Sequence, residues 1–135
     1  MLMRLLISIV VLAVLGVGLY IRMAPHDADR WHRPIVESSD ADLKTGAVRV
    51  FDASPDTLAR ADRYLRALPR TRVLAGSVEE GRITYVTRSR FFGFPDYTTI
   101  EIVDGKLRAY ARLRFGKSDM GVNRQRLEGL LAALQ

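Results

Sequence analysis

One apolar stretch near the start of the chain constrains its structure more than any other feature. Residues 5–21 read LLISIVVLAVLGVGLYI, seventeen residues without an ionisable side chain, and Arg4 and Arg22 flank them. Long arginine side chains can reach from an apolar layer to its polar surface. The length lies near the lower limit for a helix that crosses a bilayer. We therefore predict a membrane-spanning anchor over residues 1–23.

Two other interpretations of this stretch stay open. Residues 16–18, Gly-Val-Gly, resemble a small-x-small cleavage site, so a cleavable signal peptide also fits. A helix buried in a soluble core or in a partner fits the same length. Tyr20 favours the anchor, because tyrosine is enriched at membrane interfaces. Three arginines in residues 22–33 favour a cytoplasmic domain only weakly, since long domains cross a membrane largely regardless of charge.

The remainder of the 135 residues has the length of one domain. The chain has no cysteine, which excludes disulfides, thiolate metal sites and thiol nucleophiles. Residues 24–46 contain two prolines, a serine pair and several aspartates, which is typical of a mostly irregular linker. We predict a linker over residues 24–46, whose isolated Trp31 docks on the domain or lies at the lipid surface, and an α+β domain over residues 47–135.

Within this domain the apolar pattern changes from helical to strand spacing and back. In residues 54–68, apolar residues recur at three- and four-residue steps after the helix-start signal Ser54-Pro55-Asp56. In residues 120–134, apolar residues recur in the same way after the possible caps Ser118 and Asp119. Alternation of apolar and polar residues predicts strands over residues 47–51, 72–78, 82–90, 96–103 and 106–115. Asp104-Gly105 predicts a type I′ hairpin turn.

These elements predict an α+β fold. After the transmembrane helix and the short strand at residues 47–51 we expect a helix, a four-stranded mainly antiparallel meander formed by the other four strands, and a C-terminal helix. Both helices are expected on one face of the sheet, because each has a single apolar stripe to bury. The other sheet face is then expected to be open to solvent.

That second face is predicted to be basic. Residues 63–135 hold fourteen basic and seven acidic side chains, a net charge of +7. A solvated sheet face would explain this charge, but it would also attract an anionic lipid, an anionic polymer or an acidic protein. Nucleic acid is disfavoured, because the strand order is not that of the usual RNA-binding sheet. The predicted ligand-binding residues are Arg88, Arg108, Arg112, Arg114 and Lys117.

Signals for catalysis are few. Both histidines, His26 and His32, lie in the predicted linker, so neither a metal site nor a serine triad is expected. No cofactor is expected either, because Ala111 stands where a phosphate-binding loop would need its first glycine. An enzyme that uses Asp96 or Asp119 with neighbouring arginines stays an alternative.

Two segments show a more specific pattern, an F-P-D motif followed by a motif of the form R-x-G-x-S-D-x-G-x-N. With them the chain resembles the bacterial and plastid family called domain of unknown function 1499, and the resemblance spans nearly the whole chain. The departure is Ala111 and Leu113, where family members often carry serines. The motif residues are Phe94, Pro95, Asp96, Gly116, Ser118, Asp119, Gly121 and Asn123.

The resemblance implies an anchored domain outside the cytoplasm, without an established activity. It outweighs the weak charge signal on orientation. We therefore expect a single-pass inner-membrane protein with a periplasmic domain that acts as a binding or accessory module. A scaffolding subunit of a membrane complex is the alternative from another class of function.

Overall fold

The computed structural model describes all 135 residues and contains four helices and six strands. The N-terminal helix α1 (Leu2–Met23) is followed by the short helix α2 (Ala28–Trp31) and by strands β1 (Ala41–Leu43) and β2 (Gly46–Asp52). Helix α3 (Thr57–Arg66) precedes strands β3 (Thr71–Ser77), β4 (Arg82–Arg88), β5 (Pro95–Val103) and β6 (Lys106–Leu113). Helix α4 (Val122–Leu134) ends the chain.

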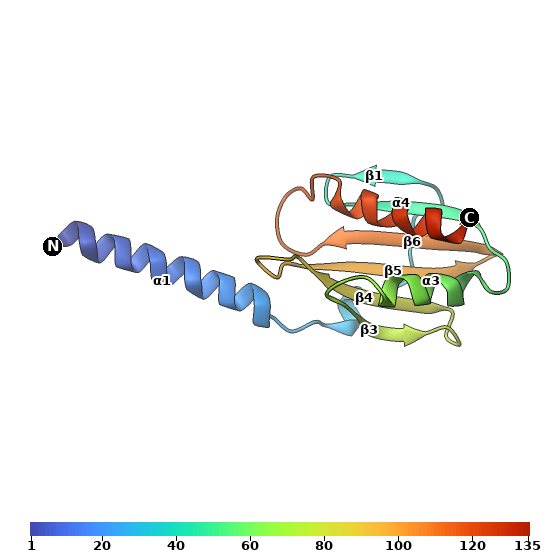
Figure 1. The fold of residues 1–135 in the computed structure, drawn as a ribbon, viewed down its shortest axis with the longest axis horizontal. Helices are drawn as coiled ribbons and strands as arrows, with labels where there is room; N and C mark the ends of the chain where they lie inside the picture. The colour runs from blue at the N-terminus through green and yellow to red at the C-terminus, as the bar shows by residue number, and fades with distance from the viewer.

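Helix α1 extends away from the rest of the molecule (Figure 1). Its 22 residues include none that is buried, and it is the one helix long and apolar enough to cross a membrane. At 1.5 Å per residue it is about 33 Å long, close to the thickness of a bilayer's hydrocarbon core. The predicted apolar helix is therefore present, and its length and composition fit either a membrane anchor or a signal sequence.

The sheet has six antiparallel strands in the order β1-β2-β6-β5-β4-β3. The α+β class and the C-terminal helix are confirmed, but the prediction of four strands is wrong. Strand β2 pairs along its whole length with β6, with Val48 opposite Tyr110, so β6 is not an edge. Strand β1 has only three residues, too few to show an alternating pattern.

Helices α3 and α4 lie together on one face of the sheet, as predicted (Figure 1). Their apolar stripes meet the alternate residues of the strands that point toward them. The buried cluster consists of Leu58, Ala61 and Leu65 from α3, Leu127 and Leu130 from α4, and Ala47, Ile83, Tyr85, Ile100, Leu107, Ala109 and Ala111 from the sheet. We call this side the helix face.

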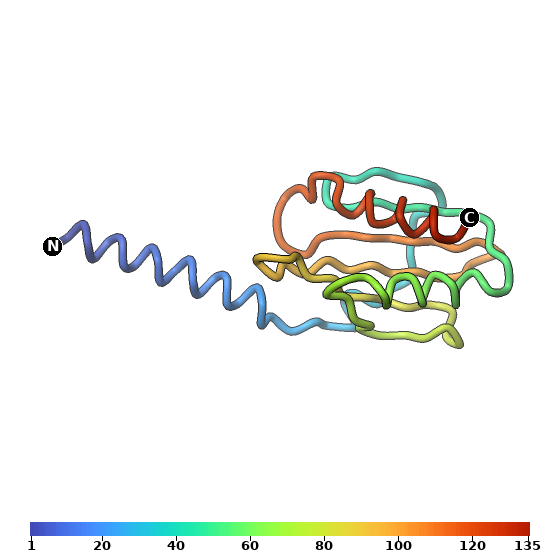
Figure 2. The backbone as a smooth tube through the Cα atoms, in the orientation of Figure 1, coloured from blue at the N-terminus to red at the C-terminus, as the bar shows by residue number.

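The opposite side is covered as well, so the prediction of an open, solvated face is wrong. Residues 24–36 leave the end of α1 and run across this side of the sheet toward β1, and Figure 2 shows the segment passing behind the strands. We call residues 24–36 the strap and this side the strap face. Trp31 stacks on Tyr97 with ring centroids 4.0 Å apart. Ile35 is 4% exposed, and its backbone N–H donates to the buried carboxylate of Glu101.

The turns and helix starts agree only in part with the local signals. Asp104 and Gly105 both have positive φ, as a type I′ turn requires. Helix α3 begins at Thr57 instead of residue 54, because residues 54–57 form a turn. In this turn the backbone N–H of Ser54 donates to the hydroxyl of Thr57. Helix α4 begins at Val122, since the positive φ of Met120 and Gly121 is incompatible with a right-handed helix.

Candidate functional site

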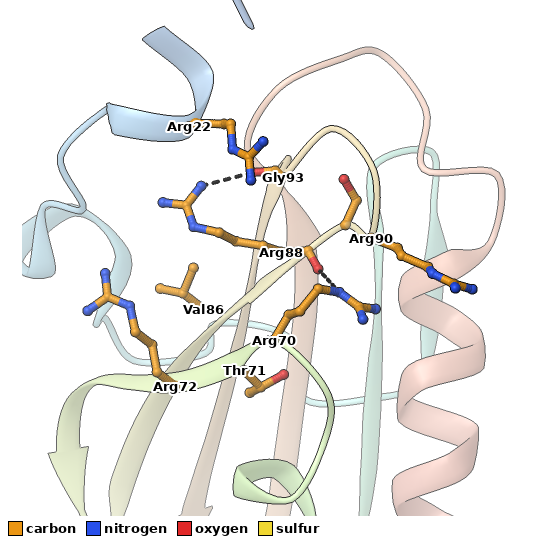
Figure 3. Close-up of a pocket in the computed structure, with 9 residues that line it drawn as sticks. Arg22, Arg70, Thr71, Arg72, Val86, Arg88, Arg90 and Gly93 are labelled. Carbon is orange, nitrogen blue, oxygen red and sulfur yellow. Dashed lines mark hydrogen bonds between the residues drawn. The ribbon is translucent and has the colours of Figure 1, made fainter. Parts of the chain in front are cut away.

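A strongly basic hollow lies where α1 meets the sheet. It is a pocket of about 460 Å³ between the last turn of α1, the start of β3 and the end of β4 (Figure 3). Five of its nine lining residues are arginines and none is a carboxylate. We call it the arginine pocket, and it is lined by Arg22, Arg70, Thr71, Arg72, Val86, Arg88, Ser89, Arg90 and Gly93.

Arg88 is the fixed centre of this pocket. Its guanidinium donates from Nη1 to the carbonyl oxygen of Gly93 at 2.9 Å and from Nη2 to Nε2 of His26 at 2.8 Å. Its own carbonyl oxygen accepts a hydrogen bond from Nε of Arg70 at 3.0 Å (Figure 3). These bonds use neutral acceptors, so they hold Arg88 in place without compensating its charge.

No arginine of the pocket forms an ion pair. The pKa of Arg88 is lowered first by burial and then by nearby positive charges, chiefly Arg72 with smaller contributions from Arg22 and Arg114. Like charges gathered in a partly dry site repel one another, and a bound anion would relieve that repulsion. Arginine suits such a role, because its planar guanidinium matches carboxylate and phosphate oxygens.

His26 links the pocket to the strap face. Burial, together with the charges of Arg88, Arg72 and Arg114, lowers the pKa of His26 to about 4, so the ring is neutral near pH 7. Because Nε2 accepts from Arg88, the ring proton lies on Nδ1, which donates to the hydroxyl of Tyr97 at 2.7 Å. A neutral histidine is therefore part of the wall that positions Arg88.

The two family-motif segments meet in a second hollow of about 300 Å³ beside the arginine pocket. Arg70, Arg88 and Ser89 line both hollows. The motif residues in the second one are Phe94, Asp96, Ser118 and Asp119. The structure therefore brings together the two carboxylates considered for acid or base chemistry, next to the arginine pocket.

Asp96 and Asp119 nevertheless have structural partners. Burial raises the pKa of Asp96, while Nη1 of Arg126, 3.4 Å from its carboxylate, acts in the opposite direction. Arg126 also donates to the side-chain oxygen of the buried Asn123 within α4, so its ion pair with Asp96 links β5 to the start of this helix. The carboxylate of Asp119 accepts from the backbone N–H groups of Gly121 and Asn123, at 3.0 and 3.1 Å. Asp119 thus satisfies amides of the first turn of α4.

The remaining motif residues shape the two connecting loops. Pro95 is buried at the start of β5. Gly116 and Gly121 have φ of 112° and 78°, values that residues with a side chain rarely adopt. Ser118 accepts a hydrogen bond from the backbone N–H of Met120. The motif is therefore accounted for by loop conformation and by the junction between β6 and α4.

The five predicted ligand-binding residues separate into three groups. Arg88 lines both hollows. Arg108, Arg112 and Arg114 instead donate to carbonyl oxygens of the strap, at Ile35, Trp31 and Pro25. Lys117 is exposed in the loop after β6. Ligand binding by these five residues stays a prediction. Within the fold, Arg108, Arg112 and Arg114 hold the strap on the sheet.

Sequence reasoning did not place Arg22, Arg70 and Arg72 in a site. Arg22 was considered only as a flank of the apolar helix, and Arg70 belongs to a turn with a positive φ of 53° after α3. Arg72 lies on β3, whose register shifts at a bulge between Val73 and Ala75. Only the charge of the three residues was visible in advance. No group of three or more metal-ligating side chains is present in the structure.

Fold and site together define an α+β protein whose sheet is covered on both faces. It has an apolar N-terminal helix and a cationic pocket where this helix meets the sheet. The chain belongs to the family described as "Protein of unknown function (DUF1499)", which matches residues 25–134. The match begins two residues after the end of α1 and includes all of the strap except Ala24. A comparison with curated proteins found no match.

Proposed function

We propose that this protein is a single-pass membrane protein that binds an anionic, phosphate-bearing group in the arginine pocket. The observation that carries the proposal is the collection of five arginines, without a carboxylate, at the end of an apolar helix. Arg22 and Arg72 line the pocket, and neither side chain has a hydrogen bond or an ion pair. An anion would provide the partner that these two guanidinium groups lack.

The head group of an anionic phospholipid is the ligand that this position favours. Arg22 directly follows the apolar stretch, so a membrane that holds α1 has its head groups at the level of the pocket. Basic residues near an anionic leaflet each contribute about 1 kcal/mol of attraction. A pocket of about 460 Å³ has the volume of a site for one small group, not for a polymer.

Native mass spectrometry of the full chain in a mild detergent tests this function. The protein is titrated with phosphatidylglycerol or with phosphatidylcholine, and the bound lipids are counted. We expect retention of phosphatidylglycerol, which weakens as ionic strength rises. Inorganic phosphate is titrated in parallel, because its competition at millimolar concentration would identify a soluble anion as the ligand.

Arg72→Glu and Arg63→Glu form a matched pair for this experiment. Both residues are exposed, and neither side chain has a hydrogen bond or ion pair, but only Arg72 lines the pocket. Reversal of one charge near the lipid should cost about 2 kcal/mol, roughly thirtyfold in affinity, for Arg72→Glu alone. Equal binding of both lipids, or an equal loss in both variants, would contradict the proposal.

We further propose that α1 stays attached, lies in the inner membrane and places the domain in the periplasm. Contacts between α1 and the domain support attachment: the rings of Tyr20 and Phe115 meet edge to face at 6.3 Å. A reporter fused after Gln135 should be active outside the cytoplasm, and the protein should stay in membranes after an alkaline wash. Cytoplasmic reporter activity, or release as a shortened chain, would overturn this topology.

A further inference from the structure

The loop between β4 and β5 exposes aromatic rings that the fold does not use. We call residues 89–94 the aromatic loop; they read Ser-Arg-Phe-Phe-Gly-Phe. Phe91 is 78% exposed and Phe92 is 70% exposed, while Phe94 at the base of the loop is 39% exposed. Two adjacent phenylalanines at the tip of one loop are unusual on a surface that meets only water.

The backbone of the aromatic loop holds these rings outward. The N–H of Ser89 donates to the carbonyl oxygen of Phe94 at 3.0 Å, and the N–H of Gly93 donates back to Ser89 at 3.2 Å. The hydroxyl of Ser89 accepts a third bond, from the N–H of Phe94 at 2.9 Å. Because the loop is closed at its base, its tip cannot fold back onto the sheet without loss of these bonds.

The aromatic loop lies at the end of the domain from which α1 extends (Figure 1). A Cβ atom added to Gly93 would lie 3.3 Å from the side chain of Arg22, which directly follows the apolar stretch. The loop between β6 and α4 reaches the same end and exposes Met120, at 90%. The tip of the aromatic loop therefore lies at the level where the apolar segment of α1 ends.

Charge around the aromatic loop favours a lipid surface. The guanidinium of Arg90 lies over the ring of Phe91, 5.4 Å from its centroid. Directly behind the loop stand the arginines of the pocket, which includes Gly93 of the loop itself. Aromatic rings beside basic side chains fit the interface of an anionic bilayer, where rings enter the boundary region and cations meet phosphates.

We propose that Phe91 and Phe92 insert into the same bilayer that holds α1, so that the domain rests on the membrane at two points. The inference rests on the proposed anchorage by α1, but not on a ligand in the arginine pocket. The second contact places the arginine pocket against the head groups and restricts rotation of the domain about the end of α1. The surface is thus a membrane-docking surface formed by the tip of the aromatic loop.

Site-specific fluorescence in lipid nanodiscs tests this docking with the full chain. The protein has no cysteine, so each single substitution accepts one thiol-reactive environment-sensitive dye. The informative variant is Phe92→Cys, which leaves Phe91 in place. Ala13→Cys in the middle of α1 reports on anchorage, and Glu79→Cys in the turn after β3 is the exposed control away from α1. Quenchers are lipids spin-labelled at a shallow or a deep acyl position, and aqueous iodide.

The dye at position 92 is expected to lie about 5–10 Å into the head-group boundary. Its emission should shift to the blue, and shallow spin-labelled lipid should quench it more strongly than deep spin-labelled lipid. The dye at position 13 should show the opposite order, and the dye at position 79 should respond to iodide alone. Phe92→Cys that responds only to iodide overturns insertion, and a dye shielded from all three quenchers identifies a protein partner or a second copy instead.

The position-13 control separates failure of the loop from failure of the anchor. Lipid quenching at position 13 without quenching at position 92 overturns the loop insertion and leaves the anchorage standing. No lipid quenching at position 13 overturns both. Arg72→Glu in the background of Phe92→Cys should leave the lipid quenching at position 92 in place, because the rings and not the pocket ligand carry the insertion.

Discussion

The helix face and the strap face belong to the same sheet, and different side chains bury them. On the helix face, twelve buried residues form one cluster in which leucine, isoleucine and alanine dominate. On the strap face, the buried side chains include Thr84, Tyr97, Thr99, Glu101 and Arg112. Apolar surface can pack in many ways, whereas each buried polar group needs its own partner. The comparison shows that the strap completes the domain through specific bonds.

The strap also differs from α3 and α4 in how easily it detaches from the sheet. It has only the four-residue helix α2 of its own, and its contacts are with single sheet residues. Segments held by a few bonds open locally with less free energy than the whole domain requires. We therefore expect mutations on the helix face to unfold the domain globally, and mutations on the strap face to release the strap first.

The largest effect is expected on the helix face from Leu127→Ala. Leu127 is fully buried in the apolar cluster, and truncation of a core leucine costs about 2–5 kcal/mol. Urea denaturation of the full chain in detergent, followed by circular dichroism, measures the loss. Leu43→Ala on edge strand β1, 40% exposed, is the control and should cost far less. Equal losses in the two variants would refute the assignment of the core.

Arg112→Met should give the second largest effect, on the strap face. The guanidinium of Arg112 donates to the Trp31 carbonyl at 2.6 Å and to the Thr99 hydroxyl at 2.9 Å, and burial lowers its pKa to about 10. Hydrogen bonds from a charged group contribute about 1.5–3 kcal/mol, while methionine keeps the apolar stem. We expect release of the strap before global unfolding.

Trp31 reports this release, because it is the sole tryptophan and stacks on Tyr97. Its emission in Arg112→Met should shift to the red at denaturant concentrations that leave the circular dichroism unchanged. Arg108→Met, which removes a single bond to Ile35, should shift the emission less. Coincident transitions by both probes would show that the two faces unfold as one unit.

A third and smaller effect is expected from Asp119→Ala at the start of α4. The carboxylate satisfies the N–H groups of Gly121 and Asn123, and loss of such a cap costs about 1 kcal/mol. Thermal denaturation should show a modest decrease in the midpoint, with the emission of Trp31 in the folded state unchanged. Asp119→Asn is the matched variant, because an amide oxygen still accepts. A larger loss in Asp119→Asn than in Asp119→Ala would contradict the capping role.

The last effect is that of pH, and it is expected on the strap face. The pKa of His26 falls from 6.5 to about 4 in the folded protein. His26 therefore binds a proton more readily when the strap is released than when the strap is docked. Docking is therefore complete above pH 6.5 and weakens as the pH falls toward 4. The pKa of His32 is lowered as well, chiefly by burial, and acts in the same direction.

Emission of Trp31 between pH 7 and pH 4.5 measures this dependence. A red shift on acidification is expected for the natural chain. His26→Gln, whose amide can still bond Arg88 but does not titrate, should reduce the shift, and His32 should account for the remainder. A red shift that is identical in His26→Gln would exclude His26 as a titrating group of the strap.

Local sequence patterns predicted most of the helix face. Leu58, Ala61 and Leu65 recur at helical spacing, and Leu107, Ala109 and Ala111 alternate along β6. Such periods depend only on the geometry of one element, so they can be read without knowledge of its neighbours. The turn at Asp104-Gly105 was predictable for the same reason, because positive φ at two adjacent residues is a local requirement.

Docking of Trp31 was expected, but its partner and the rest of the cover on the strap face escaped prediction, because the contacting residues are far apart in the sequence. Trp31 meets Tyr97, and Ile35 meets Glu101, across more than sixty residues of chain. Arginines at alternate positions of β6 are expected both on a face open to solvent and on a face covered by a polar backbone segment. A guanidinium group can donate hydrogen bonds to water or to backbone carbonyl oxygens. The prediction of an open basic face failed at this point. Strands were expected near β2 to β6, but β1, the six-stranded order and the cover were not.

The sequence by itself determined the apolar helix, the class of fold, the helix face and the membership of the motif segments in one family pattern. Each of these depends on local spacing or on a contiguous motif. The tertiary structure alone decided the pairing of β2 with β6, the docking of the strap and the gathering of Arg22, Arg72 and Arg88 in one pocket. Those features are contacts between distant segments, and the free energy of such contacts is defined only once the chain has folded.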